Sequence, residues 1–227
     1  MSVMDVVPIV LLAALLGLDV VTFPQAMISR PIVAATAAGA FLDNAFAGLM
    51  IGSVLELIAL GMLPFGASKY PEWGSASVVG GALFAGQHGS PPGALAVCVL
   101  AALMTAVVSG WSMVKLRRIN AFRATRLRSE LDAGSSDAIV GLQLFGLTAD
   151  FVRGGLVALA AMLIFRWLVP TIVAVWAAGA VYSQAIVVAI AAVVAAGAVW
   201  KIFHSIPRAA LYFLAGLAVS MSLLVAR

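Results

Sequence analysis

The sequence predicts an all-α, polytopic membrane protein with short and re-entrant segments in its N-terminal third. Hydrophobic residues make up 64% of the chain and charged residues only 10%, whereas soluble domains carry about 25% charged residues. Residues 73–114 contain no Asp, Glu, Lys or Arg. Repeated ten-residue segments of alternating polarity, which are typical of a membrane β-barrel, do not occur. We therefore expect one integral membrane domain over residues 1–227.

The N-terminal third contains short apolar runs rather than full-length spans. Residues 1–18 lack a basic n-region and a clear cleavage site, so we expect a retained membrane segment. A crossing helix needs about 20 apolar residues, but the first charge-free runs are shorter and suit half-crossings or spans that tolerate one polar residue. In the longer run that follows, GQHGSPPG at 86–93 predicts a turn between two crossings. We expect six to eight membrane segments. The short runs are 6–18, 31–42, 44–55 and 57–68.

Residues 115–137 form the one long polar stretch and divide the chain. We expect residues 1–114 to hold the N-terminal helices and the candidate ligand-binding residues discussed below. We expect 115–137 to be a basic loop and 138–227 to hold the C-terminal helices. The positive-inside rule places the loop in the cytoplasm. Its cations either mark topology alone or also dock a cytosolic partner or anionic lipid headgroups. They are Lys115, Arg117, Arg118, Arg123, Arg126 and Arg128.

The stretch TFPQAMISRP (22–31) predicts irregular backbone. Pro24 and Pro31 each disfavour the helical conformation of the preceding residue. Non-helical backbone at membrane depth persists only against protein or a water-filled cavity, where Gln25 and Ser29 could bind a hydroxylated ligand. Alternatively, this stretch is an interfacial loop from which Arg30 extends to the headgroups. The residues alone leave both readings open.

Glu56 stands inside an apolar run, where a carboxylate must pair, face water or bind a ligand. It could accept hydrogen bonds from two hydroxyl groups of a sugar, or it could form a structural pair with Arg30 or Lys69. We expect Pro64 and Gly66 to end its helix and free carbonyl oxygens at the same depth.

The remaining isolated charges suggest structural roles. Lys69 and Glu72 flank Tyr70-Pro71, a pattern that indicates emergence at the membrane interface. Asp150 and Arg153 are spaced to form an ion pair on one helix face.

Other chemistries lack the residues that they need. Cys98 lies in an apolar stretch and is expected to be a small buried side chain. His88 and His204 lie far apart, and neither has a second ligand at helical spacing. No phosphate-binding GxxxxGK[ST] motif or Ser/His/Asp arrangement is found. We therefore expect no enzyme activity, no metal, no cofactor and no nucleic-acid partner.

The run RPIVAATAAGAFLDNAFAGLMIGSVLELIALGMLPFGASKYPE resembles the IIC membrane subunit of the mannose/fructose/sorbose phosphotransferase systems. Within it, the family's recurring positions are matched by Arg30-Pro31, Leu42-Asp43, Gly52 to Glu56, Leu60-Gly61, Gly66-Ala67 and Pro71-Glu72.

The resemblance implies a permease subunit of the bacterial inner (cytoplasmic) membrane, not an enzyme. Such a subunit works with a IID membrane subunit and with cytosolic IIA and IIB proteins, which carry the phosphoryl group from phosphoenolpyruvate. It moves a hexose or related sugar by an elevator-like displacement, and it assembles as a trimer in the bilayer. The resemblance places the sugar near Gln25 and Glu56. The full candidate set is Glu56, Gln25, Ser29, Arg30, Asp43 and Gly66.

Departures from the family pattern at Ser29, Gln25 and Pro64 support one alternative, and the isolated acidic residues allow another. Ser29 stands where the family usually has His, and Pro24-Gln25 occupy a region where an acidic residue is common. One alternative is a non-transporting homologue that acts as a sensor or scaffold for a phosphotransferase relay. The other is an ion-coupled transporter that uses Asp19, Asp43 and Glu56.

Overall fold

The computed structural model describes residues 3–20, 22–62, 69–87 and 89–225, so Pro64, Gly66 and His88 lie outside the described residues. The described part is helical and contains no strand, which confirms the predicted fold class. The helices are α1 (Val3–Leu18), α2 (Pro31–Ala40), α3 (Ala45–Ala59), the 3₁₀ turn η1 (Leu60–Met62), α4 (Trp73–Ala85), α5 (Ala94–Arg126), α6 (Arg128–Asp132), α7 (Ser136–Ala174), α8 (Ala180–Phe203) and α9 (Ala209–Val225).

The described chain contains both long and short apolar helices. Four segments are long and apolar enough to cross a membrane: Ala45–Met62, Ala94–Arg126, Ser136–Ala174 and Ala180–Lys201. By contrast, α2 has 10 residues and is therefore about 15 Å long, half the thickness of the hydrocarbon core. Helices α1, α4 and α9 are also shorter than a full span. The runs 6–18 and 31–42 thus fall in the short helices α1 and α2, whereas the run 44–55 belongs to the longer segment Ala45–Met62.

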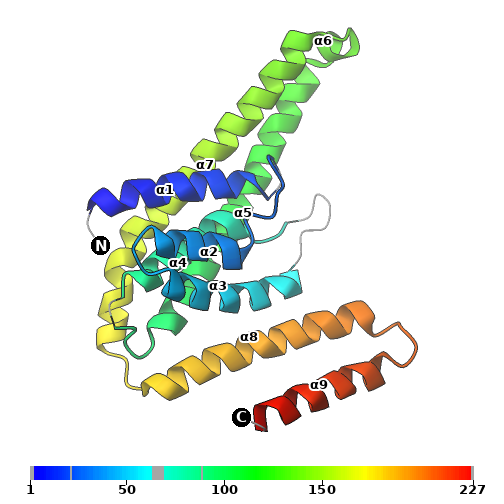
Figure 1. Ribbon diagram of the computed structural model, residues 1–227. Helices are drawn as coiled ribbons and strands as arrows, with labels where there is room; N and C mark the ends of the chain where they lie inside the picture. Colours follow the sequence, from blue (N-terminus) through cyan, green and yellow to red (C-terminus); the bar gives the residue numbers. More distant parts are fainter. Residues whose placement is uncertain (1–2, 21, 63–68, 88, 226–227) are drawn as a thin grey trace.

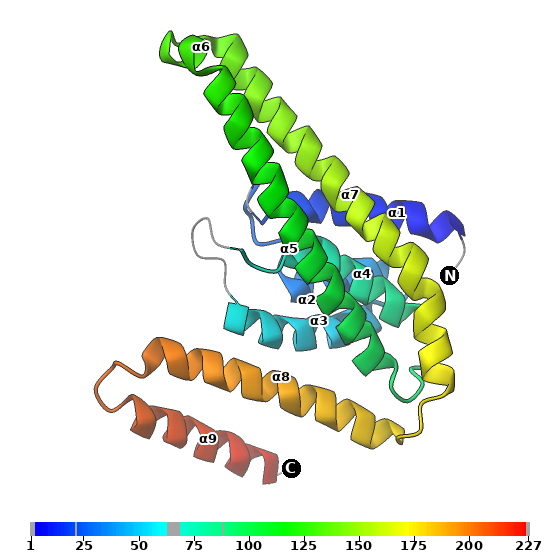
Figure 2. The same cartoon turned by 180° about the vertical axis from the view of Figure 1, so that it is seen from behind.

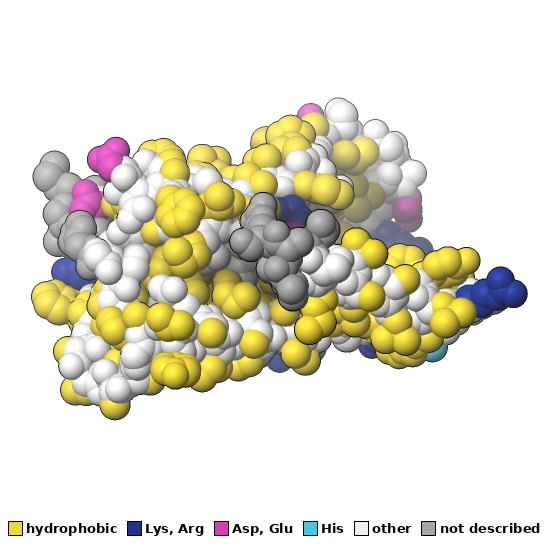
Figure 3. Space-filling view, turned by 60° about the horizontal axis from the view of Figure 1, so that its bottom comes forward, with side chains coloured by type: hydrophobic (Ala, Val, Ile, Leu, Met, Phe, Trp, Pro, Cys, Tyr) yellow, Lys and Arg dark blue, Asp and Glu magenta, His cyan; other side chains and the backbone are white. Residues whose placement is uncertain are grey.

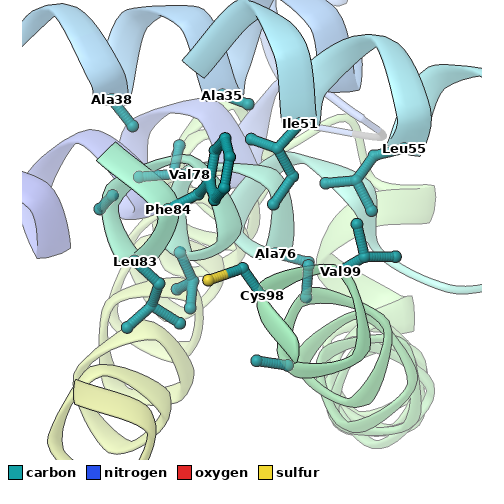
Figure 4. Close-up of a cluster of buried hydrophobic side chains, with 14 of the residues drawn as sticks. Ala35, Ala38, Ile51, Leu55, Ala76, Val78, Leu83, Phe84, Cys98 and Val99 are labelled. Atoms are coloured by element: carbon teal, nitrogen blue, oxygen red, sulfur yellow. The ribbon is translucent and has the colours of Figure 1, made fainter. Parts of the chain in front are cut away.

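Helix α4 is the centre of the molecule. All its residues, Trp73–Ala85, are buried, because α1, α2, α3, α5 and α7 all pack against it. A helix that is apolar on every side has to be enclosed in this way. Figure 4 shows the core around it, where Phe84 of α4 lies beside Ile51 of α3, with Leu55 farther along α3 and Cys98 of α5 nearby.

Glycines allow the short helices to pack with their backbones in near contact. A Cβ atom on Gly48 would lie 2.3 Å from the carbonyl oxygen of Ala35, and one on Gly52 would lie 3.0 Å from the Cα atom of Ile32. The pair of small residues at Gly48 and Gly52 therefore forms the interface between α3 and α2, as is common for helices in membranes. Gly81 brings α4 equally close to the backbone of Ala35.

The polar stretch 115–137 is mostly helical, which corrects the prediction of a loop. Helix α5 continues to Arg126, and the short helix α6 lies in the connection between α5 and α7. Ser135 is the N-cap of α7, where its hydroxyl group accepts a hydrogen bond from the Ala138 amide at 3.3 Å. Lys and Arg are good helix formers, so the charges do not end the helix.

Together α5 and α7 form a long antiparallel pair that projects beyond the bundle (Figures 1 and 2). We call its outer part, residues 115–148, the arm. Since α5 has 33 residues, it is about 50 Å long, well beyond the roughly 30 Å of the hydrocarbon core. The cytoplasmic location of the arm stays a prediction.

Helices α8 and α9 run antiparallel to each other. Helix α8 packs against α3, and α9 lies on the other side of α8 from α3 (Figure 2). The rings of Trp200 and Phe213 join them edge to face at 6.0 Å. Hydrophobic side chains cover much of this side of the molecule (Figure 3). Such a surface suits contact with lipid or another apolar subunit.

We predict that Gly81→Ala destabilises the protein by about 1–3 kcal/mol, because the added methyl group would meet backbone atoms that cannot rotate away. The measurement is thermal unfolding of the purified protein in detergent. Gly141→Ala is the control, since nothing lies within 4 Å of a Cβ atom there. The control is expected to raise stability by up to about 1 kcal/mol. Equal effects of the two changes would contradict the packing described for α4.

Candidate functional site

The segment between α1 and α2 is irregular, as predicted, and it is organised by one carboxylate. The side chain of Asp19 accepts hydrogen bonds from the Ala26 amide at 2.6 Å, the Ser29 amide at 2.9 Å and the Ser29 hydroxyl at 2.8 Å. Asp19 is only 3% exposed. Three donors compensate for the removal of this carboxylate from water. The loop is therefore folded around Asp19, and Ser29 is committed to that contact.

Arg30 and Glu56 form an ion pair at the start of α2. The guanidinium of Arg30 donates to Glu56 Oε1. Glu56 Oε2 accepts from the Ile32 amide at 3.3 Å, one of the amides that a helix leaves unpaired at its first turn. The sequence allowed Glu56 to pair with Arg30 or with Lys69, and the structure shows the pair with Arg30. The carboxylate is thus held by the protein itself.

A cavity of about 330 Å³ lies against this loop. This volume is within the range of small-molecule sites. Asp19, Gln25, Ser29 and Arg30 supply its polar wall. Apolar side chains complete the lining: Val20, Met27, Pro31, Ala59, Met62 and Trp73. An apolar enclosure with a few convergent polar groups is the usual form of a binding site.

Trp73 is the aromatic member of this lining, and its indole N–H is buried without a hydrogen-bond partner among the described residues. Buried indole N–H groups normally find an acceptor. Trp73 therefore places a largely buried aromatic side chain beside the polar loop.

The structure brings together some of the predicted site residues and separates others. Gln25, Ser29 and Arg30 line the cavity. Glu56 does not line it but forms an ion pair with Arg30, which does. Asp43 lies in the turn at the opposite end of α2, about 15 Å away along that helix. Gly66 is outside the described residues.

The position of Asp43 corrects one expectation from the sequence. It does not join Gln25 and Arg30 at the cavity, because the length of α2 separates them. Asp43 and Asn44 instead make the turn between α2 and α3, where Asn44 caps α3 by accepting from the Ala47 amide.

A second polar cluster, which the sequence did not reveal, lies at the start of α4. Glu72 is fully buried, so the prediction that it marks the membrane interface is wrong. Its carboxylate accepts from the Ser75 amide at 3.1 Å, from the Ser75 hydroxyl and from the Ser109 hydroxyl at 2.7 Å. It caps the N-terminus of α4, where a negative charge is favourable. The available signal was an acid three residues before Ser75 at the start of an apolar run.

Arg153 links this cluster to α7. Its guanidinium donates to the Ser109 hydroxyl at 2.8 Å and pairs with Asp150 at 2.8 Å, which confirms the predicted ion pair. Asp150 in turn accepts from the Thr22 hydroxyl at 2.5 Å. Because Thr22 belongs to the loop that lines the cavity, this chain of contacts fastens that loop to α7. We call it the buried network; it consists of Thr22, Glu72, Ser75, Ser109, Asp150 and Arg153.

A family model and several relatives in sequence all point to the same protein family. A family model described as "PTS system sorbose-specific iic component" matches residues 3–178. The fructose permease IIC component of Bacillus subtilis (strain 168) is 29% identical over 150 residues, which are 66% of this chain and 52% of that protein. The sorbose-specific EIIC component of Klebsiella pneumoniae is 32% identical over 89 residues, 39% of this chain and 33% of that protein.

A mannose-specific EIIC component of Escherichia coli (strain K12) is 28% identical over 98 residues, 43% of this chain and 36% of that protein. The chain thus spans about half or less of the length of these relatives.

Two solved structures share the fold. One, described only as a membrane protein, superposes with a TM-score of 0.69 at 20% identity over 100% of this chain and 96% of that chain. The other is the mannose transporter ManYZ in complex with microcin E492, with a TM-score of 0.63 at 20% identity over 97% of this chain and 87% of that chain. At this identity the likeness concerns the fold alone.

We predict that Asp150→Asn destabilises the protein by about 3–5 kcal/mol, because it leaves the Arg153 guanidinium buried without its counter-charge. Thermal unfolding in detergent measures the effect. Asp132→Asn is the matched control: its pair with Arg128 is exposed, and its loss should change stability by less than about 1 kcal/mol. Similar losses in both variants would show that the buried network does not hold the fold.

Proposed function

The chain belongs to the family of sorbose-specific IIC components of the phosphotransferase system, and from this membership we propose that it is the membrane permease subunit of a phosphoenolpyruvate-dependent sugar phosphotransferase system. In this proposal it forms the path of a hexose or related sugar across the bacterial cytoplasmic membrane. Phosphoryl transfer is the work of separate cytosolic IIA and IIB proteins. A IID membrane subunit is its partner, and the fold shared with the mannose transporter ManYZ supports this pairing.

The cavity beside the α1–α2 loop is the observation that carries the proposal. A sugar ring has polar edges and apolar faces, so it needs hydrogen-bond donors and acceptors around a flat apolar surface. Gln25 and Arg30 stand on the polar wall of the cavity, and Trp73 stands on its apolar side. The size of the cavity and its mixture of groups fit one monosaccharide unit.

Each polar residue has a distinct part in this proposal. Gln25 lines the cavity with an exposed side chain, and its amide can both donate and accept. Arg30 donates to sugar oxygens while Glu56 holds its guanidinium in place. Glu56 therefore acts as a positioning residue rather than as a direct ligand. Asp19 shapes the loop through the Ser29 and Ala26 contacts.

The contacts of the site also limit how an elevator-like movement could occur. Thr22 ties the loop to Asp150 of α7, and Glu72 ties the start of α4 to Ser109 of α5. Moving the cavity past α5 and α7 would break the buried Glu72–Ser109 contact and the half-buried Thr22–Asp150 contact, which is costly. We therefore propose that the cavity moves together with α4, α5 and α7. The boundary of the moving part then lies at α8, which packs on α3 and η1.

The sensor or scaffold reading remains a second candidate because of one observation. Ser29 stands where the family usually has His. Its hydroxyl group donates a hydrogen bond to Asp19 and is therefore not free to bind a ligand in the cavity. A homologue that had lost transport could keep such a folded loop. Uptake of labelled sugars by cells that co-express the chain with IID, IIA and IIB partners distinguishes the two functions. Uptake that depends on phosphoenolpyruvate supports the permease, and its absence with every sugar tested supports the scaffold.

We predict that Glu56→Gln lowers sugar uptake by about 10-fold or more, because the guanidinium of Arg30 loses a charge-assisted hydrogen bond and its fixed position. The amount of protein in the membrane should stay unchanged, as checked by quantitative immunoblotting. Asp43→Asn is the matched control and should transport like the unchanged protein, since Asp43 lies at the far end of α2. Full activity of Glu56→Gln, or an equal loss in Asp43→Asn, would contradict the proposed site.

A further inference from the structure

One face of α7 is left uncovered by the rest of the described chain. Helix α7 runs along the edge of the bundle (Figures 1 and 2), and its inward face is buried at Ala158, Ala161 and Met162. On the opposite face, side chains recur at intervals of three and four residues, a spacing that places them in one row along a helix. All of them are exposed except Arg166, which is half-buried. We call them the outer row: Leu156, Leu159, Leu163, Arg166, Trp167 and Pro170.

The outer row lies at the depth of the hydrocarbon core. It begins three residues after Arg153, which donates hydrogen bonds to the Ser109 and Ser112 hydroxyls of α5. Both serines stand near the end of the charge-free run 94–114, which is about 31 Å long and matches the thickness of the hydrocarbon core. Because α7 is antiparallel to α5, the outer row continues from there for about 21 Å back along this run. Lipid or another membrane helix therefore has to cover it.

Arg166 is the one charged residue of the sequence between Arg153 and Lys201. Its guanidinium lies 5.0 Å from the ring centroid of Trp167, and in the part of the chain that the structure describes it forms no ion pair with a carboxylate. A cation at membrane depth is costly, and it is retained when it meets a partner there. The outer row thus carries a positive charge whose counter-charge this chain does not supply among its described residues.

Arg166 also lines a small cavity, together with Gln87 at the C-terminal end of α4. Its volume is about 140 Å³, well below the roughly 300–1,000 Å³ of small-molecule sites, so we expect no sugar there. The exposed ring of Trp167 stands at the same cavity, and Trp and Arg are the residues that most often anchor subunit interfaces. A single carboxylate side chain that entered from a neighbouring helix could pair with Arg166 and accept from the Gln87 amide.

We propose that the outer row is the docking surface for a transmembrane helix of the IID subunit, and that this helix carries an Asp or Glu side chain that pairs with Arg166. The identity of the subunit rests on the proposed function, whereas the carboxylate follows from the charge of Arg166. Apolar side chains spaced by three and four residues form the seam between two packed helices, and one polar residue in such a seam fixes its register. Polar contacts between helices also add to their packing in membranes.

Photo-cross-linking in cells that co-express the full chain with IID tests the surface. The photoreactive residue benzoylphenylalanine replaces Leu163, which is 51% exposed in the outer row. In the matched control it replaces Leu214 of α9, which is 60% exposed. Mass spectrometry should find an adduct of the chain with IID from position 163 and not from position 214. An adduct between two copies of the chain at position 163, adducts with lipid alone, or equal adducts with IID from both positions would overturn the proposal.

A second experiment tests the charge separately from the apolar contacts. Arg166→Gln should lower the amount of IID retained by the tagged chain in detergent by about 10-fold, as expected for the loss of a charged hydrogen bond, while gel filtration shows a folded chain. Arg166→Lys, which keeps the charge, should retain more IID than Arg166→Gln. Arg208→Gln is the matched control and should retain IID fully, because Arg208 is exposed in the connection between α8 and α9.

The outcomes separate this surface from the proposed function. If the unchanged chain retains no IID, the proposed pairing fails and the docking surface fails with it. If the unchanged chain and Arg166→Gln retain IID equally, the pairing stands and the assignment of Arg166 to the interface is wrong.

Discussion

The ion pair between Arg30 and Glu56 is the interaction on which the candidate site depends. It joins Arg30, the N-cap residue of α2, to Glu56 in the last turn of α3. Near this pair, Gly52 lets the backbones of the two helices approach each other. An isolated charge in a membrane is costly, but a paired charge with further hydrogen bonds is compensated. Because Arg30 is also part of the cavity wall, the pair that stabilises the α2–α3 contact also places a donor where a ligand could bind.

The buried network extends this arrangement to the long helices. Glu72 begins the fully enclosed helix α4, and its carboxylate is satisfied by an amide and two hydroxyl groups. Through Ser109 and Arg153 the same contacts reach Asp150, and through Thr22 they return to the loop beside the cavity. In low dielectric such a connected set is stable only when every member keeps its partner. The loop, α4, α5 and α7 are therefore expected to respond together to any change at the site.

Much of the fold could be predicted from the sequence because hydropathy and helix-breaking residues act locally. The long apolar runs predicted the membrane helices, and Pro24 and Pro31 predicted the irregular loop. The pairing of Arg30 with Glu56 was foreseen as one of two readings, since periodicity cannot decide which distant residue a charge meets. The helical arm was missed because a dense run of cations was read as a loop, although Lys and Arg favour helices.

The buried network could not be predicted in the same way. Glu72 follows Lys69, Tyr70 and Pro71, which together look like an interface, and the packing of α1 and α5 around it removes it from water. Ser109 looks like a neutral residue of an apolar span until Arg153 of another helix reaches it. Asp43 matched the family pattern in sequence, yet the length of α2 keeps it from the cavity. These errors share one cause, which is that contacts between distant segments are not encoded in local spacing.

The central claim is that the sugar occupies the cavity between the α1–α2 loop and Trp73. A cryo-electron density map of the chain with the proposed IID subunit and a sugar tests this claim most directly. The account predicts ring-shaped density within hydrogen-bond distance of Gln25 and Arg30, against the face of Trp73, with Glu56 still bonded to Arg30. Sugar density elsewhere, with this cavity empty or filled by side chains, would contradict it.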